Sequence, residues 1–451
     1  MTQAIKKKLN DSAAARWTAL FIVSLAMMFG YFFTDVMSPL EPLLTASVQD
    51  GGLGWSSDEY GFFSGSYGFF NVFLLLLFFG GIVLDKFGIR FTGIMSTTLM
   101  FVGAMIKWYA VTNTFQGELF GYQMQVIIAC IGFATYGVGV EIVGITATKV
   151  IAKWFTGHEL ALAMGAQVAL ARLGTAAALS LALPFAQQFG GVGASVALGA
   201  ALLCAGVLAF LVYCVMDRKF DKDAAESADN GPEEIFKFSD LGLLFCNKGF
   251  WYITLLCLMF YSGVFPFLKF ATKLMVIKYG VEPHLAGWIP SMLPYGTIVL
   301  TPLFGYIYDR IGKGATLMVI GSVLLTFVHA VFAVPSINNV SVAVCMMIVL
   351  GVAFGLVPSA MWPSVPKIIP MHLLGSAYAL IFYIQNIGLS LVPIAIGKIN
   401  QANTDAQGVI DYTQSMTTFT SFGIIAIIIA LLLLREDKIK QYGLEEKNIK
   451  D

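Results

Sequence analysis

Charged residues are scarce in this chain of 451 residues. Only 12% of the residues are Asp, Glu, Lys or Arg, and 58% are hydrophobic, whereas a soluble domain carries about 25% charged residues. The 27 basic and 27 acidic residues give a formal net charge of zero, and no basic domain is present that would grip nucleic-acid phosphates. The composition therefore predicts a polytopic membrane protein.

Motifs for metals, nucleotides and covalent catalysis are also missing. The four histidines lie mostly at the ends of apolar runs, and the six cysteines include no CxxC spacing. The chain contains neither GxxxxGK[ST] nor HExxH. We therefore expect no cofactor and no metal, and we disfavour a membrane-embedded enzyme. A receptor that binds a ligand without transporting it is a further alternative.

Long apolar runs dominate the sequence instead. A helix needs about 20 apolar residues to cross a bilayer. Twelve segments meet this length, and they are 17–40, 58–81, 91–112, 121–149, 158–185, 192–216, 249–277, 285–308, 315–335, 341–366, 373–397 and 413–434. The longest polar stretch follows the sixth segment. We therefore predict an N-terminal six-helix bundle (1–216), a cytoplasmic central linker (217–248) and a C-terminal six-helix bundle (249–451).

The distribution of Lys and Arg predicts the orientation of these spans. Most of these residues lie in the two termini and in the even-numbered connections, whereas the opposite loops carry mostly acids. By the positive-inside rule, both termini face the cytosol. The first apolar run has the length of a span and no clear cleavage site, so we expect a retained first helix.

One sequence motif recurs in each half. The segment GIVLDKFGIR ends the second span, and GYIYDRIGK ends the eighth, so both follow G-x-x-x-D-[KR]-x-G. Glycine permits tight turns and close helix approach, and charges at helix ends can pair in one conformation and separate in another. A generic tight turn with solvated charges is the alternative. The residues to which we assign a gating role are Asp85, Lys86, Arg90, Asp309 and Arg310.

Two opposite charges interrupt very apolar spans. Glu141 lies in the fourth span and Arg172 in the fifth, and each charge costs at least about 2.5–3.5 kcal/mol near the bilayer centre. At about 1.5 Å per residue, both lie roughly 20 Å from the basic ends of their spans, close to mid-depth. Three interpretations are open. They are a fixed salt bridge, recognition of a carboxylate by Arg172 and an ammonium by Glu141, and proton coupling through Glu141.

Weaker polar positions in other spans complete the predicted substrate site. Asp35 has the alternative of an interfacial charge, and Lys269 has the alternative of snorkelling to the interface. Amides buried in a membrane protein often tie helices together rather than bind a ligand. The polar or aromatic positions that we assign to the site are Asp35, Tyr67, Asn71, Lys269, Trp362, Gln385 and Asn386.

Two copies of the loop motif in a chain of twelve spans resemble the signature of the major facilitator superfamily. The resemblance implies an all-α membrane protein with twelve transmembrane helices in two pseudo-symmetric six-helix bundles. More specific segments resemble the dipeptide-transporting branch, namely Tyr31 and Asp35 ahead of a proline, the Glu141 and Arg172 pair, and MWPSVP with the later GSAYAL and IQNIGLS. This resemblance implies that Glu141 holds the peptide amino terminus and Arg172 the carboxylate, and it adds Tyr31 to the substrate site.

The resulting functional hypothesis is transport of dipeptides by alternating access, as a uniporter. The alternative is a proton-coupled symporter of an organic anion or a sugar acid. The N-terminal tail MTQAIKKKLNDSAAARW lacks the acidic dileucine signal of the animal members, so we expect a bacterial inner membrane. We expect a monomer whose partners are the small-molecule substrate and the lipid bilayer, and the sequence indicates no accessory subunit.

Overall fold

The structure is a computed structural model that describes residues 12–155, 159–225, 241–370 and 373–447. Within these residues, ten helices are long and apolar enough to cross a membrane. The helices that carry these spans are α1 (Ala13–Asp35), α5 (Leu76–Thr112), α6 (Met124–Phe155), α7 (Leu160–Phe189), α8 (Val192–Ala225), α10 (Lys248–Ile277), α13 (Gly314–Ala333), α14 (Val340–Ile368), α15 (Leu374–Ala402) and α16 (Thr413–Lys440).

The second span is broken, so the prediction of one continuous helix over 58–81 is wrong. It consists of α3 (Ser57–Gly65), the 3-10 turn η3 (Ser66–Gly68) and α4 (Phe69–Phe73), and it continues in the first turns of α5. Leu75 adopts a left-handed conformation with φ of 55°, which costs roughly 1–2 kcal/mol for a residue with a side chain. The break therefore follows from the packing of this segment and not from its apolar pattern.

The repeated motif turns the chain in the same way in both halves. Gly88 has φ of 76° and interrupts the helical geometry of α5. Gly312 also has φ of 76°, and it separates α12 (Trp288–Ile311), the eighth span, from α13. These two glycines occupy matching places in the motif, and the left-handed region is open to glycine because it lacks a Cβ. The internal repeat is thus visible in the backbone.

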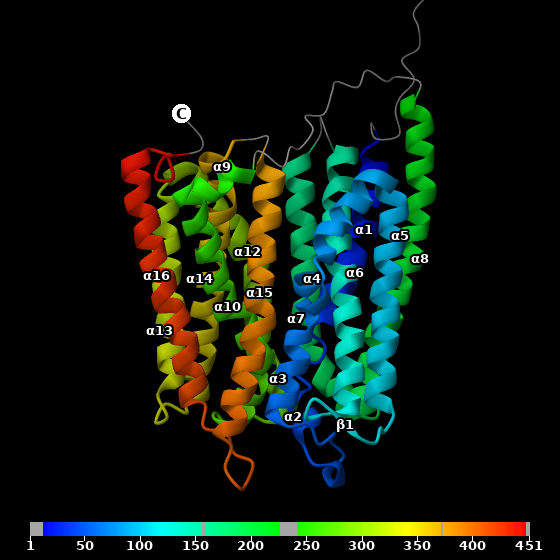
Figure 1. Cartoon of the computed structure of the whole chain (residues 1–451), viewed down its shortest axis with the longest axis vertical. Coiled ribbons are helices and arrows are strands. Elements are labelled where there is room, and N and C mark those ends of the chain that lie inside the picture. Colours follow the sequence, from blue (N-terminus) through cyan, green and yellow to red (C-terminus); the bar gives the residue numbers. More distant parts are fainter. Residues whose placement is uncertain (1–11, 156–158, 226–240, 371–372, 448–451) are drawn as a thin grey trace, which may run out of the picture.

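The spans form two bundles that lie side by side (Figure 1). The N half contains α1 to α8, and the C half contains α10 to α16. We call the side where α1 begins and α16 ends the terminal side, and the opposite side the far side. Short elements lie at these ends, namely α2 (Glu41–Thr45), η2 (Val48–Asp50), β1 (Glu118–Leu119), β2 (Tyr122–Gln123), α9 (Leu241–Cys246) and α11 (Pro283–Ala286). The range 217–248 thus includes the end of α8 and all of α9.

Backbone contact joins the two halves toward the far side. A Cβ on Gly61 of α3 would lie 2.7 Å from the Cα of Gly397 of α15, so the two helices touch there. The backbone N–H of Ser57 donates to Oε1 of Gln401, at 2.9 Å, and the hydroxyl of Tyr60 donates to the carbonyl of Lys269, at 2.7 Å. The far side is therefore closed by contact between α3 and helices of the C half.

Candidate functional site

Glu141 lies on α6 and is held by a tyrosine of the broken second span. Its Oε1 accepts a hydrogen bond of 2.7 Å from the hydroxyl of Tyr67. Tyr67 belongs to η3, whose backbone touches α6 because Gly137 has no side chain: a Cβ there would lie 2.1 Å from the Tyr67 carbonyl oxygen. The glycine one turn before Glu141 therefore lets the tyrosine reach the carboxylate, which stays half-buried.

Arg172 lies on α7 at the boundary between the two halves. Its guanidinium carbon is 5.9 Å from the ring centroid of Tyr31, which belongs to the N half. It is 5.4 Å from the ring of Phe265 and 5.1 Å from the ring of Phe354, which belong to the C half. Each such cation–π contact is worth about 0.5–2 kcal/mol. The rings orient the guanidinium but leave its N–H groups without an acceptor among the described residues.

Glu141 and Arg172 form no ion pair, with each other or with any other residue in the described part of the chain. Both side chains are half-buried. This geometry argues against the fixed salt bridge that the sequence left open. Two opposite charges that are held apart and still accessible suit a ligand that carries one charge of each sign.

Asp35 and Lys269 contact each other across the two halves. The Lys269 ammonium lies 2.6 Å from Oδ1 of Asp35 and donates to the carbonyl of Thr34, at 3.0 Å. One helical turn further along α10, Lys273 approaches the fully buried Glu41, at 3.9 Å. Lys269 thus connects α10 to the end of α1, and Lys273 connects it to α2, both on the far side of the Glu141 and Arg172 level.

Two of the predicted amides contact another helix, and the third contacts its own helix. Nδ2 of Asn71 donates to the carbonyl of Gly137 on α6, at 3.1 Å. Oε1 of Gln385 accepts from the thiol of Cys257 on α10, at 3.3 Å, and Nδ2 of Asn386 donates to a carbonyl of its own helix, at 3.0 Å. All three amides are buried. The contacts of Asn71 and Gln385 fit the helix-tying alternative, whereas that of Asn386 joins no second helix. A role in binding stays a prediction for all three.

Trp362 is linked to Arg172 through aromatic rings. Its indole N–H donates to the hydroxyl of Tyr261, at 3.0 Å, and the Tyr261 ring contacts both Phe265 and Phe354. Those two rings flank Arg172. The C half therefore presents a connected aromatic surface that runs from the arginine along α14 toward the terminal side.

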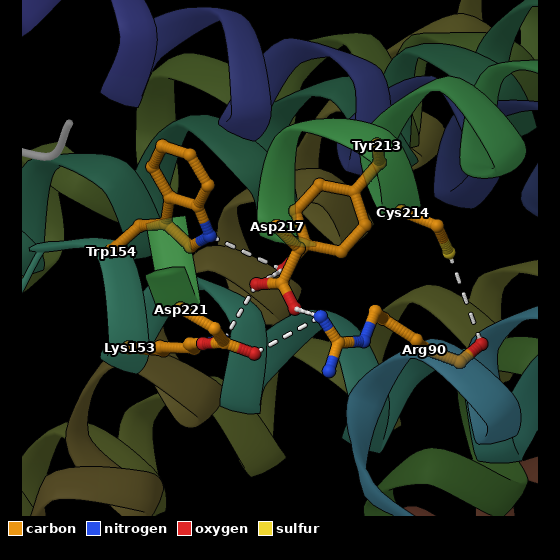
Figure 2. Close-up of polar contacts among 7 residues, drawn as sticks. All are labelled: Arg90, Lys153, Trp154, Tyr213, Cys214, Asp217 and Asp221. Atoms are coloured by element: carbon orange, nitrogen blue, oxygen red, sulfur yellow. Dashed lines mark hydrogen bonds and ion pairs between the residues drawn. The ribbon is translucent and has the colours of Figure 1, made fainter. Parts of the chain in front are cut away.

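Arg90 belongs to a charged cluster at the terminal end of the N half (Figure 2). It lies 3.0 Å from Asp221 and 3.6 Å from Asp217, both on α8. Lys153 of α6 contacts the same two carboxylates, at 2.6 and 2.7 Å. Asp217 is buried and also accepts from the hydroxyl of Tyr213, at 3.0 Å. The cluster ties the signature turn to α6 and α8.

The other residues of the repeated motif make different contacts. The Lys86 ammonium lies 5.6 Å from the ring of Phe87, and the Arg310 guanidinium lies 4.8 Å from the ring of Tyr306. Asp309 lies in the last turn of α12. The side chain of Asp85 lies outside the described part of the structure. The gating role of these residues stays a prediction.

Sequence reasoning assigned no role to several charged residues that make contacts in the structure. Asp217 and Asp221 are four residues apart at the end of the sixth span, and this spacing places them on one helix face. Glu41, Lys107 and Lys273 are also charges in or beside apolar runs, so the criterion that singled out Glu141 would have found them. Within the described residues, no group of His, Cys, Asp and Glu is suited to hold a metal.

The fold and these motifs define a family. The chain belongs to the Major Facilitator Superfamily, whose family model matches residues 17–393. The predicted resemblance to this superfamily and the twelve-helix fold are therefore confirmed, and the chain is a multi-pass membrane transporter.

The chain is similar to curated proteins of this superfamily that are named as dipeptide transporters. The chain is 26% identical over 371 residues to the lysosomal dipeptide transporter MFSD1 of Homo sapiens, covering 80% of this chain and 76% of that protein. It is 28% identical over 381 residues to the protein of the same name from Danio rerio, covering 82% and 77% of the two chains.

Solved structures share the fold at lower identity. The nucleoside transporter NupG superposes with a TM-score of 0.69 at 16% identity, covering 93% of this chain and 99% of that chain. A mutant of the peptide transporter POT superposes with a TM-score of 0.65 at 14% identity, covering 95% of both chains. At these identities the likeness shows the fold alone.

Proposed function

We propose that this protein transports dipeptides, with Glu141 binding the peptide ammonium and Arg172 binding the carboxylate. The observation that carries the proposal is the pair of accessible, opposite charges that do not neutralise each other. The two ends of a dipeptide are common to all dipeptides, so a site that holds only these ends tolerates many side chains. The similarity to curated dipeptide transporters supports this choice of substrate.

The contacts around Arg172 support transport by alternating access. Its guanidinium touches rings of both halves, so a carboxylate bound there would lie where the halves meet, as expected for transporter sites. A ligand that contacts both halves changes the relative free energies of their arrangements. The far side is closed in this structure, and we propose that the site exchanges its ligand through the terminal side in this state.

The location and coupling of the protein complete the proposal. The basic loops favour a cytosolic terminal side, and we propose a bacterial inner membrane, a monomer and uniport. Uptake of a dipeptide into proteoliposomes with and without a pH gradient tests the coupling. Equal rates under both conditions support uniport, and uptake that follows the gradient would replace it with symport.

The binding mode is tested by changing the protein and the ligand together. We expect a free dipeptide to raise the Tm of the purified wild-type protein. N-acetylation of the dipeptide should remove most of this stabilisation in the wild type but have little further effect in Glu141→Gln. C-terminal amidation should remove most of the stabilisation in the wild type but have little further effect in Arg172→Ala. Each lost charge–charge contact should weaken binding at least about tenfold, or roughly 1.4 kcal/mol.

The decisive outcome is whether the effects of changing the ligand and of changing the residue add. If the two groups bind each other, the combined effect is smaller than the sum of the two single effects. If acetylation weakens binding equally in the wild type and in Glu141→Gln, the ammonium is not bound by Glu141. Tyr67→Phe removes the hydroxyl that contacts Glu141 and retains the carboxylate, so it should weaken dipeptide binding while acetylation still weakens binding further. Stabilisation by an organic anion without an amine, and not by dipeptides, would favour the alternative symporter.

A further inference from the structure

The third span carries a lysine that is completely enclosed by protein. Lys107 of α5 has an exposure of 0%, and its ammonium lies 3.7 Å from the ring centroid of Phe33 and 4.5 Å from that of Phe133. Its one hydrogen bond within the described residues, to the carbonyl of Phe33, is long at 3.4 Å. No carboxylate lies within ion-pair distance of Lys107 among the described residues. These few contacts replace only part of the water that burial removes, and an incompletely solvated buried charge costs several kcal/mol.

The carboxylate at the end of α1, near the carbonyl that Lys107 contacts, is already paired with another lysine. Asp35 ends α1, two residues after Phe33, and Lys269 of the C half contacts its carboxylate at 2.6 Å. The Lys107 ammonium contacts the carbonyl of Phe33, and the Lys269 ammonium contacts the carbonyl of Thr34, so the two ammonium groups bind consecutive residues at the end of α1. The C-terminal end of a helix also favours cations. Two lysines, one from each half, thus compete for the end of α1.

The two lysines belong to different moving parts if the halves separate on the far side. Asp35 and Lys107 are both in the N half and would move together, whereas Lys269 would withdraw with the C half. Asp35 is only 8% exposed, and a buried carboxylate that loses its partner is costly unless another cation replaces it. Lys107 is the cation placed to do so.

We propose that Lys107 forms an ion pair with Asp35 when Lys269 withdraws, and that this pair stabilises the state open to the far side. In this structure, the Lys107 ammonium lies among aromatic rings, and Lys269 is the ion-pair partner of Asp35. Lys107 is then a positioning residue of the transport cycle and does not touch the substrate. The inference rests on the proposed alternating access and assigns one residue to one of its two states.

The test measures the populations of the open and closed far side. Spin labels at Gln49→Cys and Gln407→Cys, both exposed far-side positions of the two halves, report their separation when Cys246 and Cys345 are replaced by Ser. We expect short and long distances in the wild type, with proportions that respond to dipeptide. Lys107→Met should deplete the long distance about tenfold, and Lys107→Arg should restore it. Lys269→Met should enrich it.

Controls separate this role from simple packing. Lys107→Met removes a buried charge and should fold, and Lys107→Gln provides a second neutral variant if it does not. In an Asp35→Asn background, Lys107→Met should change the populations no further, because the acceptor is gone. Unchanged populations in both neutral variants, or full effects without Asp35, would overturn the proposal. A wild type with one fixed distance in every condition would instead overturn alternating access itself.

Discussion

At the residue scale, burial decides how much each charged side chain contributes to stability. Asp217 and Asp221 contact the same two cations, yet the side chain of Asp217 is 2% exposed and that of Asp221 is 40% exposed. Exposed ion pairs contribute about 0–1 kcal/mol because solvent screens them. Removing one partner of a buried pair costs about 3–5 kcal/mol, because the remaining charge is left without compensation. The two acids therefore differ in their importance although the sequence presents them alike.

This difference gives a prediction for the charged cluster. Asp217→Asn should lower stability by an amount near the lower end of about 3–5 kcal/mol, because Asp221 can still contact Lys153 and Arg90. Asp221→Asn, the matched control, should cost at most about 1 kcal/mol. Thermal unfolding of both variants in detergent measures the contrast. Equal losses of stability would show that burial does not distinguish the two carboxylates.

At the element scale, close helix approach builds the site. The second span can bring Tyr67 to Glu141 only because it breaks into short helices and because α6 offers a surface without a side chain at Gly137. Small residues allow helix backbones to touch within membranes. The site therefore depends on the contact between η3 and α6 as much as on its charged residues.

A pair of glycine variants on α6 tests this dependence. Gly137→Ala would place a Cβ 2.1 Å from the Tyr67 carbonyl oxygen, so η3 must move away and the bond from Tyr67 to Glu141 should be lost. We expect at least about tenfold weaker dipeptide binding, equivalent to about 1.4 kcal/mol. Gly144→Ala is the control, since its Cβ would meet nothing closer than 3.6 Å. Similar binding by the two variants would contradict the role of this contact.

At the scale of the whole molecule, the two halves repeat one plan but differ in their charges. Both turn at a matching glycine, whereas the N half fixes its turn with Arg90, Asp217 and Asp221 and the C half uses its C-terminal segment. There, Glu445 accepts from the backbone N–H of Thr316 at 2.9 Å and from its hydroxyl at 2.8 Å, which caps the start of α13. The same fold is therefore stabilised by different means in each half.

The orientation of the whole molecule is a further prediction. Cys246 is exposed on α9 at the terminal side, and the basic loops place that side in the cytosol. With Cys345 replaced by Ser, a membrane-impermeant maleimide should modify Cys246 only after cells are permeabilised. In a Cys246→Ser background, Gln407→Cys should react in cells with an intact inner membrane. The reverse pattern would invert the topology.

The sequence by itself determined the class of fold, the number of spans and the repeat, and it predicts the depth of Glu141 and Arg172. These properties are local, because the length of an apolar run and the cost of a charge in lipid are set within one segment. The dipeptide substrate, uniport and the bacterial inner membrane stay predictions that the fold does not test.

Only the tertiary structure decided which groups meet. Lys269 pairs with Asp35, Tyr67 with Glu141, and Arg172 with rings of both halves, although these partners are far apart in the chain. The broken second span was likewise invisible in its apolar pattern. Partners of this kind depend on how helices pack, and packing is a property of the assembled bundle that no single span contains.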